Sequence, residues 1–279
     1  MAGKKKTKQK QKCTPASIDP LDFYYSTPNS KLLTILIIVS IIIVVVMLFI
    51  FKYFTDSVKN NPVQNNVVSG YLSLVGIPVG VTLAFVVTSV WTNYSTAQSQ
   101  LNDEATEVLA LYKLIGNYPV KREVRRIQAE IVEYTEFIIN QEFDLMSQGI
   151  QSAEAFNMLE NIGQSIYSLN PSTPKQTSIY NQAIALYQRI LALRISRMGY
   201  VSQGIPLELW WVLILGIAIV FFISFFICFE CIWIHVIMTA LATAAVVSLL
   251  FLIIAFDFPY KGDFALSSNG FQLAMQRMG

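Results

Sequence analysis

The chain has 279 residues, of which 54% are apolar and only 14% are charged, and its formal net charge is +2. Its mean hydropathy is +0.49, which is more apolar than the exterior of a water-soluble protein of this length allows. This composition excludes an ordinary soluble globular protein, and so small a net charge gives no reason to expect nucleic-acid binding. A lipid bilayer, by contrast, solvates apolar side chains directly.

Four long apolar runs are separated by polar sequence, as in a protein that crosses a membrane several times. About 20 helical residues at 1.5 Å rise per residue span a hydrocarbon core of about 30 Å. The first run has this length, contains no charged residue and is followed by no small-residue cleavage site. It therefore predicts a transmembrane helix rather than a signal peptide. The runs cover residues 32–51, 71–91, 207–229 and 232–256.

Basic residues are concentrated before the first run and in the long segment between the second and third runs. The first connecting loop, by contrast, has only Lys52 and Lys59. Because cytoplasmic loops carry an excess of Lys and Arg, both termini and the long middle segment are predicted to lie in the cytoplasm.

These features predict an all-α polytopic membrane protein, with four transmembrane helices and a cytoplasmic helical domain between the second and third. A disordered basic cytoplasmic tail is expected over residues 1–30, and a cytoplasmic C-terminal segment over residues 257–279. The remaining parts are 31–93, with the first two transmembrane helices and an outer loop at 53–69; 94–205, the helical domain; and 206–256, a tight hairpin of the last two transmembrane helices.

The middle segment has helical patterns throughout. No stop signal follows the second run before Gly116 and Pro119, so the second transmembrane helix is predicted to continue well into the cytoplasm. Apolar residues at three- and four-residue steps then predict a helix from Pro119 to a stop at Gly149. Two further helices are expected over residues 152–167 and 177–199.

The second run is the least lipid-like of the four, because small and hydroxyl residues recur along it at four-residue steps. Such a face has two interpretations. In the first, small residues such as Gly76 and Gly80 let helices approach closely. In the second, hydroxyls and small side chains line a water-filled path, and a bulky residue forms its constriction. Both hold if several copies of the helix surround one axis. The candidate pore-lining residues are Gly76, Gly80, Ala84, Phe85, Thr88 and Thr92.

Charged residues follow on the extension of this helix. Asp103, Glu104 and Glu107 lie within a few turns of the membrane, where carboxylates at a channel mouth select ions by attracting one sign of charge. The alternative is a solvated helix face held by ion pairs, which is the commoner use of such runs.

His235 is expected about one turn inside the fourth transmembrane helix. An intramembrane histidine costs free energy unless it finds a partner, so His235 is either a functional group or an interfacial side chain satisfied by a neighbouring helix. A weaker alternative is a metal or redox site formed by Cys228, Glu230, Cys231 and His235, although the usual Cys-x-x-Cys redox motif lies at a helix start in a βαβ unit.

The sequence contains no phosphate-binding loop, Gly-rich dinucleotide turn, Ser/His/Asp set or pair of catalytic carboxylates. With one histidine and none of these motifs, the chain is not expected to be an enzyme, and no cofactor is predicted.

The order of the segments and several short motifs resemble the bestrophin-like family of four-helix membrane proteins. The most specific motif is Phe256-Asp257-Phe258-Pro259-Tyr260-Lys261-Gly262-Asp263, and the similarity covers about residues 70–275. The other matching stretches are residues 83–85, 91–94, 102–105, 206–210 and 234–241.

This resemblance implies a relation to bestrophin anion channels, which are pentamers with the pore along the second span and a hydrophobic neck. It places Phe85 and the face formed by Gly76, Gly80 and Ala84 near an axis. The chain differs from that pattern in having Phe85 as its one mid-span aromatic residue, where bestrophin necks carry several.

The leading functional hypothesis is a homo-oligomeric channel or pore for inorganic ions in a lipid bilayer, lined by the second transmembrane helix. The rival hypothesis is a non-conducting membrane scaffold or sensor whose cytoplasmic helices bind a partner.

Overall fold

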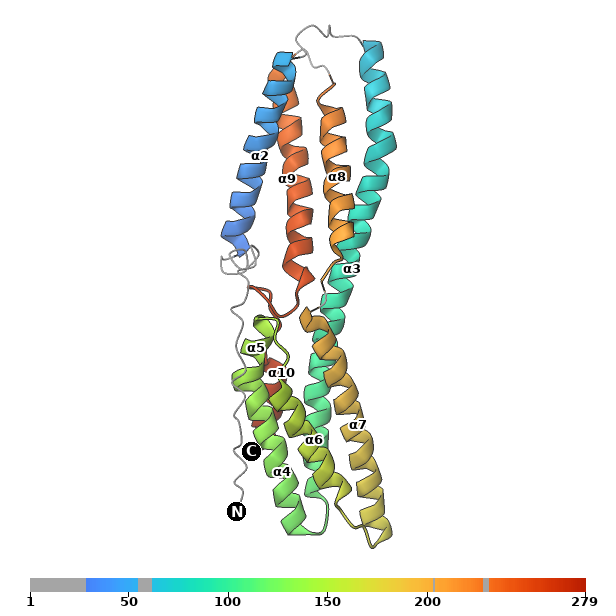
Figure 1. Ribbon diagram of the computed structural model, residues 1–279, viewed down its shortest axis with the longest axis vertical. Coiled ribbons are helices and arrows are strands. Elements are labelled where there is room, and N and C mark those ends of the chain that lie inside the picture. The colour runs from blue at the N-terminus through green and yellow to red at the C-terminus, as the bar shows by residue number, and fades with distance from the viewer. Residues whose placement is uncertain (1–28, 55–61, 203, 228–230) are drawn as a thin grey trace, which may run out of the picture.

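The computed structural model describes residues 29–54, 62–202, 204–227 and 231–279, and within these ranges every regular element is a helix. Four of the helices are long and apolar enough to cross a membrane, and they lie together at one end of an elongated molecule (Figure 1). They are α2 (Asn29–Phe54), α3 (Pro62–Gly116), α8 (Leu207–Ser224) and α9 (Ile232–Asp257). The predicted fold class, an all-α protein with four transmembrane helices, is confirmed.

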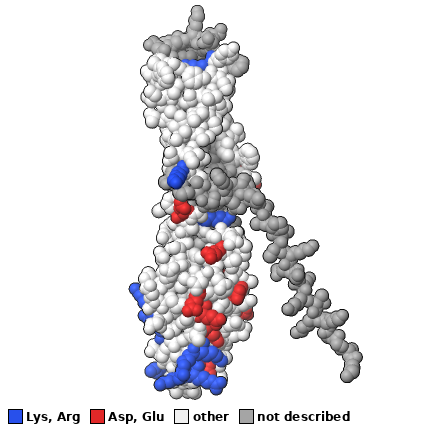
Figure 2. Space-filling view, turned by 90° about the vertical axis from the view of Figure 1, so that its left-hand side faces the viewer, with Lys and Arg blue, Asp and Glu red and all other residues white. Residues whose placement is uncertain are grey.

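The surface of this membrane end is almost free of charged side chains (Figure 2). α2 packs mainly against α9, and α3 packs against α8 and α9. Many bulky apolar side chains point outward, such as Ile42 and Leu215, which are 56% and 62% exposed. Outward-facing apolar side chains are what lipid contact requires, because hydrocarbon solvates them at no cost.

α3 is 55 residues long and runs from the membrane end into a second helical unit. The continuation to Gly116 is as predicted. The expectation of a loop up to residue 69 is wrong for residues 62–69, which already belong to α3. The physical reason is Pro62, whose fixed backbone angle and missing N–H suit the first position of a helix. Residues 55–61 of the expected loop, and most of the expected basic tail, lie outside the described ranges.

The remaining helices pack around the C-terminal half of α3 and, together with it, form what we call the extramembrane bundle (Figure 1). They are α4 (Lys121–Phe137), the π-helix η1 (Ile138–Glu142), α5 (Phe143–Ser147), α6 (Ala153–Tyr167), α7 (Pro174–Ser202) and α10 (Asn269–Gln276). α4, η1 and α5 follow one another without a break and end at Ser147, two residues before the predicted stop at Gly149, whose φ of 77° favours glycine.

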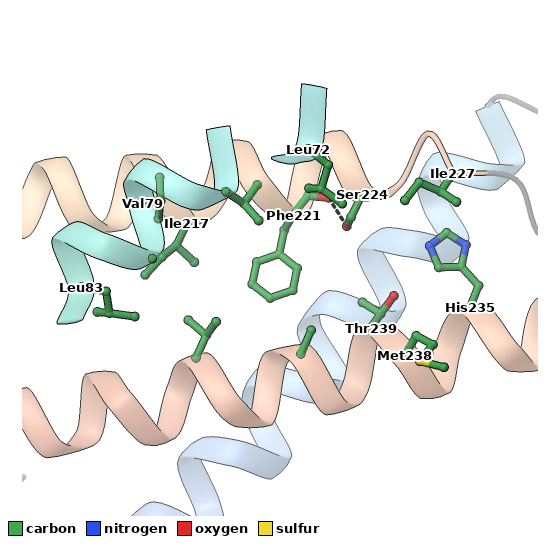
Figure 3. A pocket seen from close by; sticks show the side chains of 15 residues that line it. Leu72, Val79, Leu83, Ile217, Phe221, Ser224, Ile227, His235, Met238 and Thr239 are labelled. Carbon is green, nitrogen blue, oxygen red and sulfur yellow. Dashed lines mark hydrogen bonds between the residues drawn. The ribbon is translucent and has the colours of Figure 1, made fainter. Parts of the chain in front are cut away.

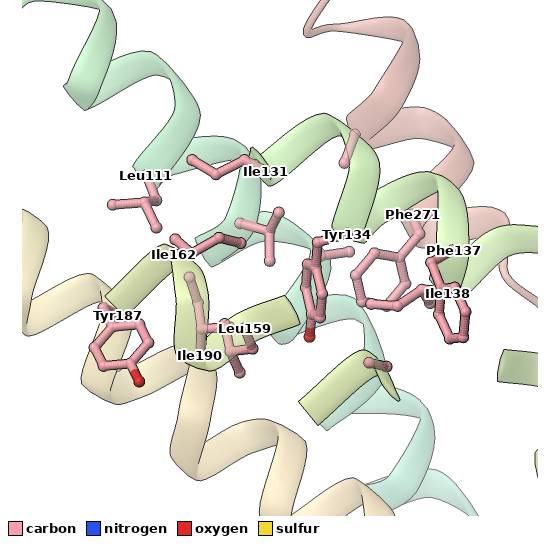
Figure 4. Packing of buried hydrophobic residues seen from close by; sticks show 14 of the residues in the cluster. Leu111, Ile131, Tyr134, Phe137, Ile138, Leu159, Ile162, Tyr187, Ile190 and Phe271 are labelled. Carbon is pink, nitrogen blue, oxygen red and sulfur yellow. The ribbon is translucent and has the colours of Figure 1, made fainter. Parts of the chain in front are cut away.

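The core of the extramembrane bundle consists of aliphatic and aromatic side chains from all its long helices (Figure 4). The C-terminal segment, which the expected boundaries left outside this unit, belongs to this core: α10 packs on α3 and α4, and Phe271 is fully buried. Gly270 allows the close approach, because a Cβ there would lie 2.9 Å from the Asn102 side-chain oxygen.

The contact between α6 and α7 depends on Gly163. A Cβ at this position would collide with the ring of the buried Tyr187. Gly199 on α7 is the opposite case, because nothing lies within 4 Å of its Cβ position.

We therefore expect Gly163→Ala to destabilise the protein by about 1–3 kcal/mol through overpacking. The matched change Gly199→Ala is expected to stabilise it by about 0.5–1 kcal/mol, because alanine favours the helix over glycine. Thermal unfolding of the purified protein in detergent, followed by circular dichroism, measures both. A Gly163→Ala variant as stable as the parent would contradict the close packing of α6 on α7.

Candidate functional site

One face of α3 is exposed along the length of the membrane end. Gly80, Ala84, Thr88 and Thr92 all lie on this exposed face, and the neighbouring Phe85 side chain is 71% exposed. The opposite face of α3 packs inward: Leu83, Val86 and Val90 are buried with Leu213 of α8 and Ile253 of α9. From Ala84 to Thr92 this stripe of small and hydroxyl residues thus points away from the helices of its own chain, whereas Gly80 also borders a cavity against α8 and α9. We call Gly80, Ala84, Thr88 and Thr92 the α3 stripe.

The hydroxyls of the α3 stripe are bonded within the helix. Thr88 Oγ1 donates to the carbonyl oxygen of Ala84 at 2.9 Å, and Thr92 Oγ1 donates to that of Thr88 at 2.8 Å. Each hydroxyl oxygen keeps lone pairs, so it can still accept a hydrogen bond from water or face a cation. The stripe is therefore polar without carrying a charge.

Gly76 and Gly80 border a cavity of about 350 Å³ between α3, α8 and α9 (Figure 3). Nothing lies within 4 Å of a Cβ at either glycine. The expectation that these two residues bring helices close together is therefore wrong within one chain. Gly216 of α8 does so instead, because a Cβ there would lie 2.9 Å from a methyl group of Val79.

His235 lies in this same cavity wall and is only 2% exposed (Figure 3). It lies one turn before Thr239 on α9 and hydrogen-bonds to the backbone of Ser224 on α8. This contact makes His235 a tie between two neighbouring helices, which is one of the two roles considered for it from the sequence.

The alternative metal site receives no support from the described part of the chain. Cys228 and Glu230 lie outside the described ranges, and Cys231 is an exposed free cysteine. No group of three potential metal ligands occurs among the described residues.

The three acidic candidates for a channel mouth have different surroundings. Asp103 is exposed, and Glu107 forms an ion pair of 3.2 Å with Arg189. Glu104, however, is completely buried. The expectation that Glu104 faces ions at a mouth is wrong, because its carboxylate is enclosed by the extramembrane bundle.

Glu104 belongs to a buried network of charges that joins α3, α4, η1 and α7. Arg197 binds it with two hydrogen bonds, from Nε at 2.6 Å and Nη2 at 3.0 Å, and Nη2 also donates to Glu142 at 3.0 Å. Arg194 forms a two-bond ion pair with Glu142. The Tyr134 hydroxyl donates to Glu104 at 3.1 Å and accepts from Arg194 at 3.2 Å. We call these five residues the buried charge network.

Within the buried charge network, the opposite charges of the carboxylates and the guanidinium groups stabilise one another. Burial raises the pKa of the Glu142 carboxyl, but the guanidinium groups of Arg197 and Arg194 outweigh burial and hold that pKa below its ordinary value. Burial lowers the pKa of Arg197, but Glu104 and Glu142 outweigh this effect and raise it. Burial also raises the pKa of Tyr134 far above its ordinary value, so its hydroxyl remains a donor.

Comparison with known proteins identifies the family. The bestrophin-like domain matches residues 37–271, which is most of the chain. The chain belongs to the bestrophin-like family. No curated protein matches the sequence.

The bestrophin-like fold is also found in crystal structures of a bacterial bestrophin homologue from Klebsiella pneumoniae. One variant of that homologue has a TM-score of 0.68, with 10% identity, over 88% of this chain and 98% of the other. A second variant has a TM-score of 0.67, with 12% identity, over 87% of this chain and 97% of the other. Another structure of the homologue gives 0.66, with 13% identity, over 87% and 97%. At such low identity the likeness shows the fold alone.

The motif that most resembles the bestrophin-like family connects the membrane end to the extramembrane bundle. Asp257, at the end of α9, accepts a hydrogen bond of 2.7 Å from the backbone N–H of Ile205, just before α8. The Tyr94 hydroxyl of α3 donates to the carbonyl of Phe264 at 2.9 Å. The last part of the chain is thus bonded to both α3 and the start of α8.

Removing one member of the buried charge network leaves a partner charge buried and unpaired. We expect Arg197→Met to destabilise this bestrophin-like protein by about 3–5 kcal/mol. The matched change Arg189→Met breaks the exposed pair with Glu107 and is expected to cost at most about 1 kcal/mol. Chemical unfolding in detergent compares the two. Equal losses would show that the network does not hold the bundle together.

Proposed function

We propose that this bestrophin-like chain assembles as a homo-oligomer in the bilayer and forms an ion channel lined by α3. The α3 stripe carries the proposal, because from Gly80 to Thr92 it is exposed and presents only small and hydroxyl side chains. The family resemblance implies five copies around one axis, with inorganic ions as the permeant species.

The α3 stripe differs from the other outward faces of the membrane end. The exposed face of α2 consists of bulky apolar residues such as Ile38, Ile42 and Val46, which suit contact with lipid tails. Small and hydroxyl side chains gain little from such contact, whereas around a shared axis they would leave room for water and offer oxygen atoms to ions. Phe85, at the edge of the stripe, would then form the narrowest point of the proposed pore.

We propose that the extramembrane bundle and both termini lie in the cytoplasm. The support is the distribution of basic residues: the bundle and the N-terminal segment are rich in Lys and Arg, whereas Lys52 and Lys59 alone mark the opposite side. The α3 stripe would then lead directly into a cytoplasmic vestibule.

A second candidate function is a non-conducting scaffold or sensor, and the charge pattern of α4 favours it. Lys121, Arg122 and Arg125 are exposed at the start of this helix, whereas Glu133 and Glu136 are exposed toward its end. Basic residues at a helix start and acidic residues at its end oppose the helix dipole, so the pattern costs stability. The basic residues gather at the tip farthest from the membrane (Figure 2), where they suit an acidic partner.

The channel proposal predicts which positions of α3 are accessible to water. In a cysteine-free background, we expect single cysteines at Ala84, Thr88 and Thr92 to react with a charged, membrane-impermeant thiol reagent, because thiolates form only where water has access. Cysteines at Leu213 and Ile253 are the matched controls, since these side chains are 1% and 0% exposed within one chain and line neither of the two cavities beside α3. Uniformly low labelling at all five positions in reconstituted protein would exclude a path along this face.

Ion flux tests the function directly. Liposomes containing the purified oligomer are expected to release ions down an imposed gradient. Chloride, potassium and sodium gradients are compared to find which ion passes. Phe85→Ala should increase the flux by widening the narrowest point. Phe49→Ala is the matched control, because Phe49 is a half-exposed aromatic residue on α2, away from α3's stripe. Oligomer without flux under any gradient, for parent and Phe85→Ala alike, would favour the scaffold or sensor instead.

A further inference from the structure

A second cavity, of about 470 Å³, lies where α3, the connection between α7 and α8, and the end of α9 meet. Its size falls within the range of about 300–1,000 Å³ that is common for small-molecule sites. Much of its wall is apolar, with Val86 and Val90 from α3, Leu209 from α8 and Phe256 from α9. The cavity is therefore suited to the body of an organic molecule rather than to a hydrated ion.

One carboxylate, that of Asp257, lies in this apolar wall. Its Oδ1 atom accepts the hydrogen bond from Ile205, and a Cβ on Gly204 would lie 3.3 Å from its Oδ2 atom. Because Gly204 has no side chain, the carboxylate remains accessible from the cavity. Ser89 and Asn93 of α3 add two uncharged polar side chains to the same wall.

The Asp257 carboxylate lacks a counter-charge within the described part of the chain. None of the described residues that line the cavity is basic, and Asp257 forms no salt bridge with a described residue. Glu104 and Glu142, the buried carboxylates of the extramembrane bundle, are each paired with arginine. A carboxylate next to an apolar wall attracts a cation more strongly than one in water, so the cavity is complementary to a positive group.

Three aromatic residues line the same cavity as this carboxylate. Phe85, Tyr200 and Phe256 line the cavity with Asp257. Ammonium groups are attracted to the faces of such rings, and a carboxylate with several aromatic side chains is a common way to bind them. We propose that this cavity binds an organic cation. Its ammonium group would lie at Asp257 and the aromatic rings, and its apolar body would lie against α3 and α8. Such an ammonium group belongs either to a free amphiphilic amine or to a lipid headgroup, because the cavity lies at the end of the apolar spans.

Calorimetric titration of the purified full-length protein in detergent tests this site, with benzyltrimethylammonium as the probe and uncharged benzyl alcohol as its comparison. We expect the ammonium probe to bind the parent protein, and Asp257→Asn to weaken its binding by at least about tenfold. Asparagine keeps an oxygen to accept the hydrogen bond from Ile205 while losing the charge. Glu208→Gln is the matched control, since Glu208 is an exposed carboxylate of α8 that does not line the cavity.

Ser89→Trp is the second variant, because it fills the cavity while keeping Asp257, and it should also abolish binding. Competition by dihexanoyl phosphatidylethanolamine, but not by dihexanoyl phosphatidylglycerol, would support a lipid headgroup as the ligand; competition by octylamine, but by neither lipid, would support a free amine. The proposal is overturned if the parent does not bind the probe, if benzyl alcohol binds equally well, or if Asp257→Asn binds it unchanged. This binding measurement is independent of ion flux, so its failure would leave the channel proposal standing.

Discussion

The pairing of buried charges is the constraint on which the arrangement of this protein depends. Arg194 and Arg197 must meet Glu104 and Glu142 inside the extramembrane bundle, because a buried charge without its partner is costly. The partners lie on α3, η1 and α7, so α3 cannot rotate or slide against α7 without breaking pairs. Since α3 is one continuous helix, its rotation in the bundle also fixes which of its faces points outward in the membrane. The α3 stripe is therefore oriented by contacts far from it.

The C-terminal segment reinforces this link between the two ends of the molecule. Asp257 is bonded to Ile205 at the start of α8, and α10 packs on α3 beside Gly270. Three chain segments thus join the membrane end to the extramembrane bundle: α3, the connection from α7 to α8, and the connection from α9 to α10. A displacement of the bundle would act on α3 and on the end of α9 together, which are also the walls of the cavity beside Asp257.

The sequence predicts the features that depend on local pattern. Length and hydropathy identify four spans, and the missing stop signal identifies the long α3. Features that depend on residues far apart in the sequence could not be predicted in this way. Glu104 has the local surroundings of an exposed acid, because its partner Arg197 is 93 residues away. Two arginines one turn apart on the apolar face of α7 were the available sign of buried carboxylates nearby. No sequence pattern indicates the π-helix that places Glu142. Nor does any pattern indicate that Gly216, rather than Gly76, is the glycine at the close helix contact.

The threonines of the α3 stripe explain how hydroxyl groups can lie on this face both in a single chain and in the proposed assembly. A side-chain donor without a partner is costly in hydrocarbon, and asparagine or glutamine at these positions would carry such donors. Thr88 and Thr92 give their hydrogens to the helix carbonyls one turn back, so lipid contact leaves no unpaired donor. In the proposed assembly, their oxygens can still accept hydrogen bonds from water enclosed by several copies of α3. A single chain therefore tolerates lipid on this face, and an assembly of chains can use the same face as a polar lining without any side chain changing its partner.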